Sequence, residues 1–477
     1  MEATQKKETI QKKKGLNDFL GSRDLTEGSP MRVLLQFAIP LLLGNIAQQL
    51  YSTADSIIVG KFVGDGALAA VGVSMPVLNL VLVLFMAVST GAGIIVAQYY
   101  GAKDYKQLSK SVGNALMLIV ITSLITTVVG LALARPMMRL IDTPEEIFEQ
   151  ACQYLEVMFA GVLALAFYNI ISGILRGMGD SVSPLLYLLV ACGLNVALDY
   201  IFVAKWNMGV MGAAVATVVS QVISAILCLV RLFHMKEVVS LNRSVVRFDK
   251  AESIKLLKLG LPAGITQGIF SMAMVVVQSL INSMGMTVAA CSIAVMRVDG
   301  FAMLPNFTFG MAISTYVGQN IGANKMKRVD QGIKAAVILN LTVSITLTLA
   351  LLFFGRSMIG WFTDTEMIKD LGVRALRILA PGYIAMGMMQ VFSGIMRGAG
   401  DTMPSMWISL VTSVILRVPT AYALAYFTKS EQWLNGSPDS IYLSLLLAWV
   451  MGAILNYAWY KRGKWRQKSL TQPQAKA

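Results

Sequence analysis

Six long stretches of this sequence contain no charged residue, and they constrain the fold more than any other feature. The stretches are 33–54, 66–102, 112–134, 206–230, 259–296 and 440–460. Each exceeds the roughly 18 apolar residues that mark a helix long enough to cross a bilayer. Hydrophobic residues make up 56% of the chain and charged residues 14%, which is more apolar surface than one soluble core can bury. The sequence therefore predicts an all-α polytopic membrane protein.

The same criterion applied along the whole chain predicts twelve transmembrane helices. They lie near 33–57, 67–98, 111–134, 148–175, 182–204, 209–232, 259–283, 289–319, 332–355, 370–396, 403–427 and 440–461. The first 32 residues are polar and carry seven Lys or Arg, a composition that does not fit a cleavable signal peptide. We therefore expect the first span itself to direct insertion into the membrane.

The positive charge is distributed unevenly along the chain. The net charge is +14, and 27 of the 40 basic residues lie in the segments 1–32, 103–110, 231–258, 325–334 and 461–477. Because these segments all fall on one side of the twelve spans, the positive-inside rule predicts that both termini are cytoplasmic. The charge thus reflects membrane topology, and we expect no nucleic acid as a partner. We expect a multi-pass protein of the cell membrane, a bacterial inner membrane, that has the bilayer as its partner and functions as a monomer.

Several kinds of chemistry are missing from the sequence. The four cysteines are scattered singly, and the one histidine is His234, so neither a disulfide framework nor a Cys/His metal site is predicted. No Gly-Lys-Ser/Thr phosphate loop is present, which argues against a nucleotide. We therefore expect no cofactor. Energy for an active process would have to come from an ion gradient, of Na⁺ or H⁺.

The chain repeats itself at an offset of about 221 residues. The nine residues Ser172–Asp180 (SGILRGMGD) recur as Ser393–Asp401 (SGIMRGAGD), and Pro184 or Pro404 follows each copy. Since six spans separate equivalent positions, the copies have the same orientation in the membrane. Secondary transporters with such parallel repeats bind substrate between their halves. The predicted domains are an N-terminal segment 1–32, an N-lobe 33–232, a linker 233–258, a C-lobe 259–461 and a C-terminal tail 462–477.

The ordered motifs resemble the multidrug and toxic compound extrusion family over essentially the whole chain. The matching segments are Ile39-Pro40, Ala54–Gly60, Val96–Ala102, the paired Arg-Gly-x-Gly-Asp loops, Leu194–Asp199 and Gly212–Thr217. The resemblance implies a cation-coupled antiporter that exports organic, often cationic, drugs or toxic metabolites by alternating access. It implies a transporter and no enzymatic activity.

Two carboxylates of the first half, Asp55 and Asp199, lie inside predicted spans. A charged side chain in a bilayer costs on the order of 2.5–3.5 kcal/mol on insertion scales, so such residues line an ion pathway or hold helices together through buried hydrogen bonds. Polar residues three or four positions apart share a helix face: Asn45, Gln48 and Ser52 with Asp55, Asn195 with Asp199, and Thr217 with Gln221 and Ser224. Their oxygens suit a hard cation such as Na⁺, and two adjacent desolvated carboxylates can also share a proton.

The family resemblance assigns roles to some of these positions. Asp55, Asn195, Asp199 and Thr217 match the proposed cation or proton site in the first lobe of relatives. Pro40 and Pro262 lie inside the first span of each half, where the missing amide hydrogen bond permits a kink. In relatives, bending of the first helix at this proline is proposed to follow cation binding, although an inert kink fits the sequence nearly as well.

The second half departs from this pattern. Arg417 lies near the position equivalent to Asn195, and no acid follows it in that span. Arg297 and Asp299 in the eighth span are predicted to form an ion pair, with a substrate contact as the alternative. The remaining candidates for a substrate cavity are the polar residues Gln48, Gln221, Gln267 and Gln278.

Three other functions fit parts of the sequence. Gly177–Asp180 and Gly398–Asp401 match the Gly-x-Gly-Asp signature of intramembrane aspartyl proteases, but the repeat places both in short connections where Asp caps the next helix. A flippase for a lipid-linked saccharide or lipid precursor, which the wider superfamily includes, would need a cationic cavity. Arg297, Arg374, Arg377 and Arg417 keep that alternative open, whereas a passive channel fits two lobes with buried carboxylates less well.

Overall fold

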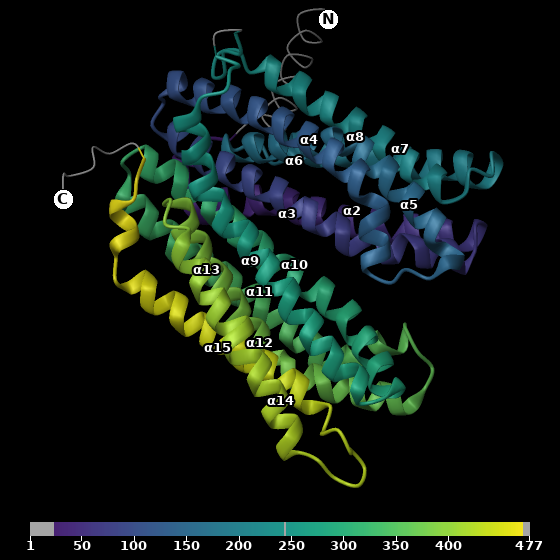
Figure 1. Ribbon diagram of the computed structural model, residues 1–477. Helices are drawn as coiled ribbons and strands as arrows, with labels where there is room; N and C mark the ends of the chain where they lie inside the picture. The colour runs from purple at the N-terminus through teal and green to yellow at the C-terminus, as the bar shows by residue number, and fades with distance from the viewer. Residues whose placement is uncertain (1–22, 243–244, 471–477) are drawn as a thin grey trace, which may run out of the picture. The chain divides into compact units, whose positions relative to one another are not determined.

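The computed structural model describes residues 23–242 and 245–470 (Figure 1). Parts of the predicted N-terminal segment 1–32 and C-terminal tail 462–477 therefore lie outside the described residues. The described part of the first half consists of α2 (Pro30–Phe62), α3 (Asp65–Gly101), α4 (Tyr105–Leu140), α5 (Glu145–Ala160), α6 (Val162–Gly177), α7 (Val182–Asp199), the π-helical turn η1 (Tyr200–Lys205) and α8 (Gly209–His234). The described residues contain no β-strand, as predicted.

The second half has a corresponding series of helices. They are α9 (Lys250–Ser283), α10 (Met286–Gly322), α11 (Met326–Gly360), α12 (Glu366–Gly398), α13 (Met403–Leu410), the π-helical turn η2 (Val411–Leu416), α14 (Arg417–Phe427), α15 (Asp439–Lys461) and the short 3₁₀ turn η3 (Lys464–Gln467). Within the described chain, eleven continuous helical segments are long and apolar enough to cross a membrane, and α5 with α6 makes a twelfth. The prediction of twelve helices in two repeated sets is confirmed.

The fourth predicted span, 148–175, is not one straight helix. It breaks at Gly161 into α5 and α6, which meet at a bend of 51°. A Cβ atom at Gly161 would clash with Val218 of α8, so the glycine permits close packing there while weakening the helix. Gly382, the equivalent residue, lies within the continuous helix α12 even though Pro381 precedes it. The repeat therefore does not dictate where its helices bend.

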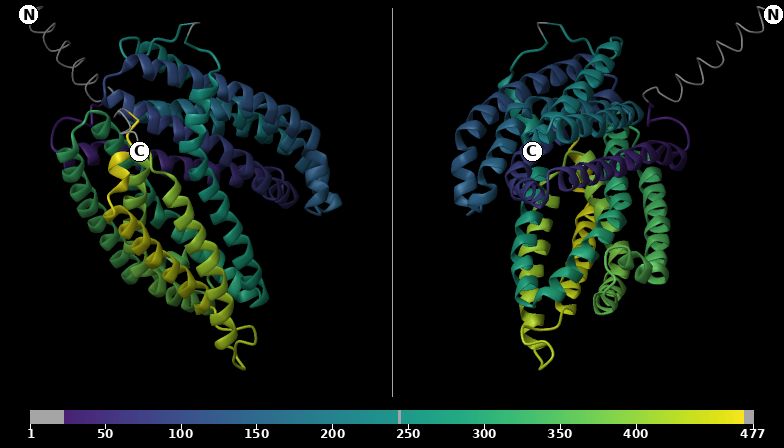
Figure 2. Two further views of the ribbon diagram at one scale, coloured as in Figure 1. Left: turned by 60° about the vertical axis from the view of Figure 1, so that its left-hand side comes forward. Right: turned by 90° about the vertical axis from the view of Figure 1, so that its right-hand side faces the viewer.

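The helices form two compact units, and the division between them falls inside α9. Among the described residues, unit 1 includes Leu35–Gly260, and unit 2 includes Gly28–Leu34 and the chain from Leu261 onward. The predicted linker 233–258 is therefore partly wrong, because its last residues, 250–258, are the first turns of α9. Figure 2 shows α9 as one continuous helix.

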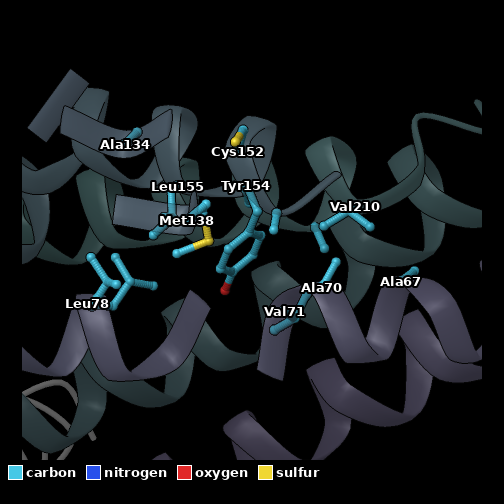
Figure 3. Close-up of a cluster of buried hydrophobic side chains, with 14 of the residues drawn as sticks. Ala67, Ala70, Val71, Leu78, Ala134, Met138, Cys152, Tyr154, Leu155 and Val210 are labelled. Atoms are coloured by element: carbon cyan, nitrogen blue, oxygen red, sulfur yellow. The ribbon is translucent and has the colours of Figure 1, made fainter. Parts of the chain in front are cut away.

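The interior of unit 1 contains an apolar cluster contributed mainly by α3, α4, α5 and α8 (Figure 3). Tyr154, only 3% exposed, lies among Met138, Leu155 and Val71. Small residues on the contact faces, namely Ala67, Ala70, Ala134, Ala151, Ala213 and Ala214, are also buried. Small side chains let membrane helices approach closely, and van der Waals packing at such close contacts drives the association of the helices.

Unit 2 has an uncharged polar network in its interior, between α10, α11 and α12. Asn306 Oδ1 accepts hydrogen bonds from Asn340 Nδ2 at 3.2 Å and from Ser344 Oγ at 2.9 Å. Asn306 Nδ2 donates to the Tyr383 carbonyl at 3.3 Å. A Cβ atom on Gly387 would stand 2.7 Å from Ser344 Oγ and 2.8 Å from Asn306 Oδ1. Only a glycine therefore leaves room for this network.

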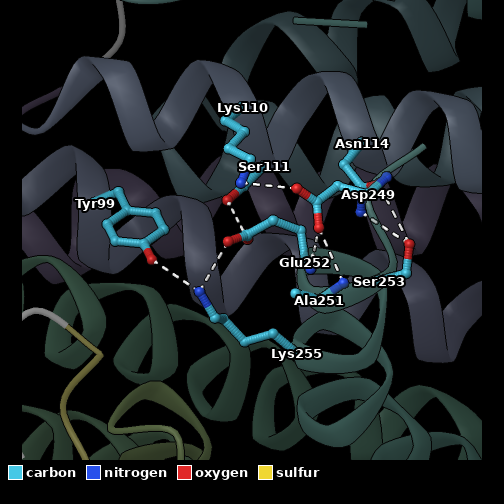
Figure 4. A network of polar contacts seen from close by, with 9 residues as sticks. All are labelled: Tyr99, Lys110, Ser111, Asn114, Asp249, Ala251, Glu252, Ser253 and Lys255. Atoms are coloured by element: carbon cyan, nitrogen blue, oxygen red, sulfur yellow. Dashed lines mark hydrogen bonds and ion pairs between the residues drawn. The ribbon is translucent and has the colours of Figure 1, made fainter. Parts of the chain in front are cut away.

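The first turns of α9 are held in unit 1 by a polar network (Figure 4). Glu252, 5% exposed, accepts hydrogen bonds from Ser111 Oγ at 3.1 Å and Lys255 Nζ at 2.9 Å. Asn114 Nδ2 donates to Ser253 Oγ at 3.1 Å. Further along α9, a Cβ on Gly260 would clash with the Ala87 carbonyl oxygen of α3. Hydrogen bonds to α4 and the close backbone contact at Gly260 with α3 together hold the first turns of α9 in place.

Asp249, the residue before α9, adds an ion pair to this attachment. Its Oδ2 lies 2.8 Å from Lys110 Nζ, and its Oδ1 accepts from the amides of Ala251 at 2.9 Å and Glu252 at 3.1 Å. The hydrogen bond from Lys110, followed by the bond from the Glu252 amide, lowers the pKa of Asp249 to about 2. The carboxylate thus stays ionised and caps the start of α9.

Candidate functional site

The four residues predicted as the coupling site come together in unit 1, from three helices. Asp55 lies near the end of α2, Asn195 and Asp199 lie one turn apart at the end of α7, and Thr217 lies on α8. Asn195 and Asp199 are fully buried, and Asp55 is 8% exposed. The spacing of four residues places Asn195 and Asp199 on the same helix face.

Asp199 also marks a change in the backbone. The α-helical geometry of α7 ends at this residue, and the π-helical turn η1 begins at Tyr200. Such turns are rare and occur frequently at functional sites. The wider turn directly follows the buried acid, so the fifth predicted span combines two kinds of helix where the sequence predicted one.

Hydrogen bonds link the cluster across α7 and α8. In the orientation that satisfies both ends of its amide, Asn195 donates to Asp199 Oδ2 at 2.8 Å and accepts from the Thr217 amide at 3.3 Å. Tyr51 of α2 donates from its hydroxyl to Thr217 Oγ1 at 3.3 Å. Asn195 and Thr217 therefore position the acid Asp199 and connect it to α2.

The two carboxyl groups are neighbours. Asp55 and Asp199 lie within hydrogen-bonding range of each other, and Oδ1 of each has no donor among the described residues. Two adjacent ionised carboxylates repel each other, and removal from water makes the repulsion stronger. A proton shared between them, or a hard cation bound by both, relieves this repulsion and supplies the missing partner. The cluster offers oxygen ligands suited to Na⁺ and a pair of acids suited to H⁺.

Two tyrosines at this site were not predicted. Besides Tyr51, Tyr154 of α5 lies within electrostatic reach of both Asp55 and Asp199, and its ring belongs to the apolar cluster (Figure 3). Tyr51 precedes Asp55 by four residues and so shares its helix face, which was an available signal. Nothing in the sequence around Tyr154 indicates its position.

The other polar candidates of the first half do not join this cluster. Gln48 and Ser52 of α2 are exposed, so the predicted stripe is buried only in part. Gln221 lies one turn beyond Thr217 on α8, and its Oε1 is buried with no partner among the described residues. Ser224 instead donates to the Tyr187 carbonyl at 3.3 Å.

The polar candidates of α9 do not form a cluster with a charged side chain among the described residues, and both predicted kink prolines lie in continuous helices. Gln267 is exposed, and Gln278 donates to Asn282 Oδ1 at 2.9 Å on the same helix. Pro262 in α9 and Pro40 in α2 each lie inside an unbroken helix. Each proline removes one amide donor from its helix, which leaves the backbone there easier to bend.

The predicted ion pair between Arg297 and Asp299 is wrong. Asp299 accepts a hydrogen bond from the Tyr383 hydroxyl at 2.7 Å, and its charged neighbour is Arg417 of α14. Arg297 is exposed. Residues two apart on a helix point in different directions, which explains the error.

Arg417 is 3% exposed, and its Nη1 approaches Met274 Sδ at 3.5 Å. Its Nε has no partner among the described residues. Of the other arginines flagged by the sequence, Arg374 forms an ion pair with Asp439, and Arg377 is exposed. Among the residues that the structure describes, the second half therefore has a buried arginine near an acid but no buried pair of carboxylates.

Comparison with known proteins gives one consistent family. The MatE family profile matches residues 40–201 and 262–423, once in each half. The chain is 30% identical over 448 residues to the probable multidrug resistance protein YpnP of Bacillus subtilis (strain 168), covering 94% of this chain and 98% of that one. It is 28% identical to the probable multidrug resistance protein YoeA of the same strain, over 93% of this chain and 96% of YoeA.

Solved structures show the same fold. A crystal structure described as MATE in the bent conformation has a TM-score of 0.86 at 24% identity and covers 93% of this chain and 98% of that one. A structure described as MATE in the straight conformation has a TM-score of 0.85, also at 24% identity, and covers 92% of this chain and 97% of that one. With two matching repeats and full-length relatives, the chain belongs to the MatE family, the multidrug and toxic compound extrusion transporters that its motifs resemble.

Proposed function

We propose that this protein is a cation-coupled antiporter that exports organic, often cationic, compounds from the cell. The single observation that carries the proposal is the buried pair Asp55 and Asp199, each with a carboxylate oxygen that has no donor among the described residues. Such a pair must bind a proton or a cation to be stable away from water. The names of the relatives as multidrug resistance proteins support the export of drugs.

Coupling requires that the cation bind one conformation better than another. In the proposed cycle, Na⁺ or H⁺ moves down its gradient and occupies the Asp55/Asp199 pair with Asn195 and Thr217. Occupancy removes the repulsion between the carboxylates and favours the state that releases substrate outside. α2 carries both Asp55 and Pro40, so a bend at Pro40 can transmit the change along that helix, and Pro262 has the equivalent place in α9.

The test is efflux of a panel of dyes from everted membrane vesicles, with Na⁺ and pH gradients imposed separately. Asp199→Asn should reduce gradient-driven transport of every dye on the order of 100-fold, because an amide cannot exchange a proton or balance a cation's charge. Asp142→Asn is the matched control, since Asp142 is exposed and its backbone φ of 51° is one that Asn tolerates. Full transport by Asp199→Asn would refute the coupling site.

The flippase alternative is tested by reversing charge at Arg417. A flippase needs cationic groups to hold a pyrophosphate, and Arg417 is a buried arginine of the second half. Arg417→Glu should therefore abolish the transport of a pyrophosphate-linked lipid if the protein is a flippase. Retained gradient-driven dye efflux in this variant supports the exporter.

The proposed topology has both termini in the cytoplasm of a bacterial inner membrane, and the proposed functional unit is a monomer.

A further inference from the structure

Arg176, which belongs to the repeated Ser172–Asp180 motif, has no protein partner in the described chain. It lies in the last turn of α6 and is largely buried. Across residues 23–242 and 245–470 it forms no ion pair and donates no hydrogen bond. The acid four residues later is already engaged: Asp180 accepts from Arg231 Nε at 3.0 Å and from the Ser183 amide at 2.9 Å. This second bond places Asp180 at the start of α7 as predicted, but the same prediction is wrong for the second copy, where Asp401 accepts from Trp459 Nε1 at 3.4 Å and α13 has no side-chain cap.

A guanidinium group has five N–H donors and a permanent positive charge. The end of a helix is a favourable place for a cation, but that effect is about 0.3–1 kcal/mol at exposed sites. It does not satisfy the donors. Removing an unpaired charge from water costs far more than this, so the group requires a further acceptor that also carries negative charge.

The structure provides room for such an acceptor. A cavity of about 50 Å³ within unit 1 is lined by Arg176, by Asn45 and Gln48 of α2, and by Ser172 and Ser181. The Gln48 amide and the Ser181 hydroxyl are hydrogen-bond donors, and no acid lines the cavity. Drug-sized ligands occupy about 300–1,000 Å³, so this volume alone does not enclose an exported compound. It is large enough for an ion and a water molecule.

We propose that this cavity binds one small inorganic anion, of the size of chloride, on Arg176 and the polar side chains of α2 that face it. The site is distinct from the Asp55/Asp199 pair. Asn45 and Asp55 are ten residues apart on α2, which is about 15 Å along the helix axis. One helix would thus contact a bound anion near Pro40 and a bound cation near its other end.

The anion site is tested by thermal unfolding of the purified full-length protein in a neutral detergent. Sodium chloride is titrated against sodium gluconate at constant ionic strength, because gluconate is too large for the cavity. Chloride should raise the melting temperature saturably, and Arg176→Gln should lose this rise. Arg297→Gln removes the same charge from an exposed position and should keep it.

Three results would overturn the proposal: an equal rise with gluconate, a saturable rise that persists in Arg176→Gln, or stabilisation by anionic lipid in nanodiscs without any response to chloride. If Arg176→Gln does not fold, Gln48→Leu replaces a donor at the exposed rim of the cavity and should weaken the chloride response.

Bromide-soaked crystals give an independent measurement. An anomalous peak beside the Arg176 guanidinium supports the site, and its absence at saturating bromide refutes it. Neither measurement depends on transport, so failure here leaves the coupling proposal standing.

Discussion

The two halves of this protein both have polar interiors, but in different places and of different chemical kinds. In the first half, acids gather where α2, α7 and α8 meet, and two carboxylate oxygens lack a donor among the described residues. In the second half, uncharged amides and a hydroxyl bond one another between α10, α11 and α12. Residues at the first-half positions about 221 earlier are apolar there: Phe85 for Asn306, Ile119 for Asn340 and Ala166 for Gly387.

The contrast separates polar groups that hold helices together from polar groups prepared to bind. A network in which each group has a partner stabilises its helices and has nothing left to offer a ligand. A cluster with unsatisfied oxygens is costly unless something binds to it. The two copies share one fold, but the buried acids without a donor lie in the first half and the network between α10, α11 and α12 lies in the second.

The largest expected effect tests whether Asp55 and Asp199 act as one unit. Asp55→Asn and Asp199→Asn should each reduce gradient-driven efflux on the order of 100-fold, equivalent to about 2.7 kcal/mol. The double variant should be no worse than either single one, because groups that act together are not additive. Initial efflux rates in proteoliposomes measure this. Additive losses would show that the two acids work separately.

The second prediction concerns the glycine that makes room for the network of unit 2. Gly387→Ala should lower the free energy of unfolding by about 2 kcal/mol, because the added methyl group overpacks against Asn306 and Ser344. Gly268→Ala is the control, since a Cβ there meets nothing within 4 Å. Denaturation in detergent measures both. Equal stability of the two variants would contradict the arrangement described for unit 2.

The third prediction distinguishes the acid of the second half from those of the first. Tyr383→Phe removes the hydrogen bond to Asp299 and should cost about 1–3 kcal/mol of stability, the cost of leaving a buried acceptor unsatisfied. The ion that drives efflux, and the concentration giving half-maximal rate, should not change. A shifted cation dependence would mean that both lobes take part in coupling.

The smallest effect is expected from Asp249, a half-buried carboxylate that already has its partners. Because the pKa of Asp249 is about 2 in the folded protein, below the ordinary 3.8, its ion pair contributes stability above about pH 4. That contribution disappears as the pH falls through 2. Asp249→Asn should therefore lower the melting temperature slightly at pH 7 and by much less at pH 2, as measured in the same detergent. A large loss of transport would show that this attachment does more than hold α9.

Much of this architecture follows from the sequence because the bilayer limits the choices. Charge-free stretches predict the helices, and the spacing of four residues predicts that Asn195 and Asp199 share a face. The same rule, applied at a spacing of two, would have excluded the pair Arg297 and Asp299. Tyr154 was missed because the mixed stretch around it, which includes Gln153 and Glu156, has no pattern that reveals which way the tyrosine points.

Helix ends were harder to predict than helix interiors. The first turns of α9 contain Glu252 and Lys255, whose charges resemble those of a solvated linker. Tertiary hydrogen bonds to Ser111 and Tyr99 satisfy these side chains, and no local pattern indicates such partners. The close packing at Gly161 is equally hidden from the local sequence, because its partner Val218 lies on another helix.

The division of the chain into two units also predicts what happens when the two halves are expressed as separate fragments. Gly28–Leu34 belongs to unit 2, and the start of α9 up to Gly260 belongs to unit 1. The first turns of each half are therefore part of the other unit. A gene split in the loop between α8 and α9 yields two fragments, neither of which encodes a whole unit. Such fragments should be recovered as a complementing pair and not as two independent half-transporters, in the manner of a swapped dimer whose subunits were later joined.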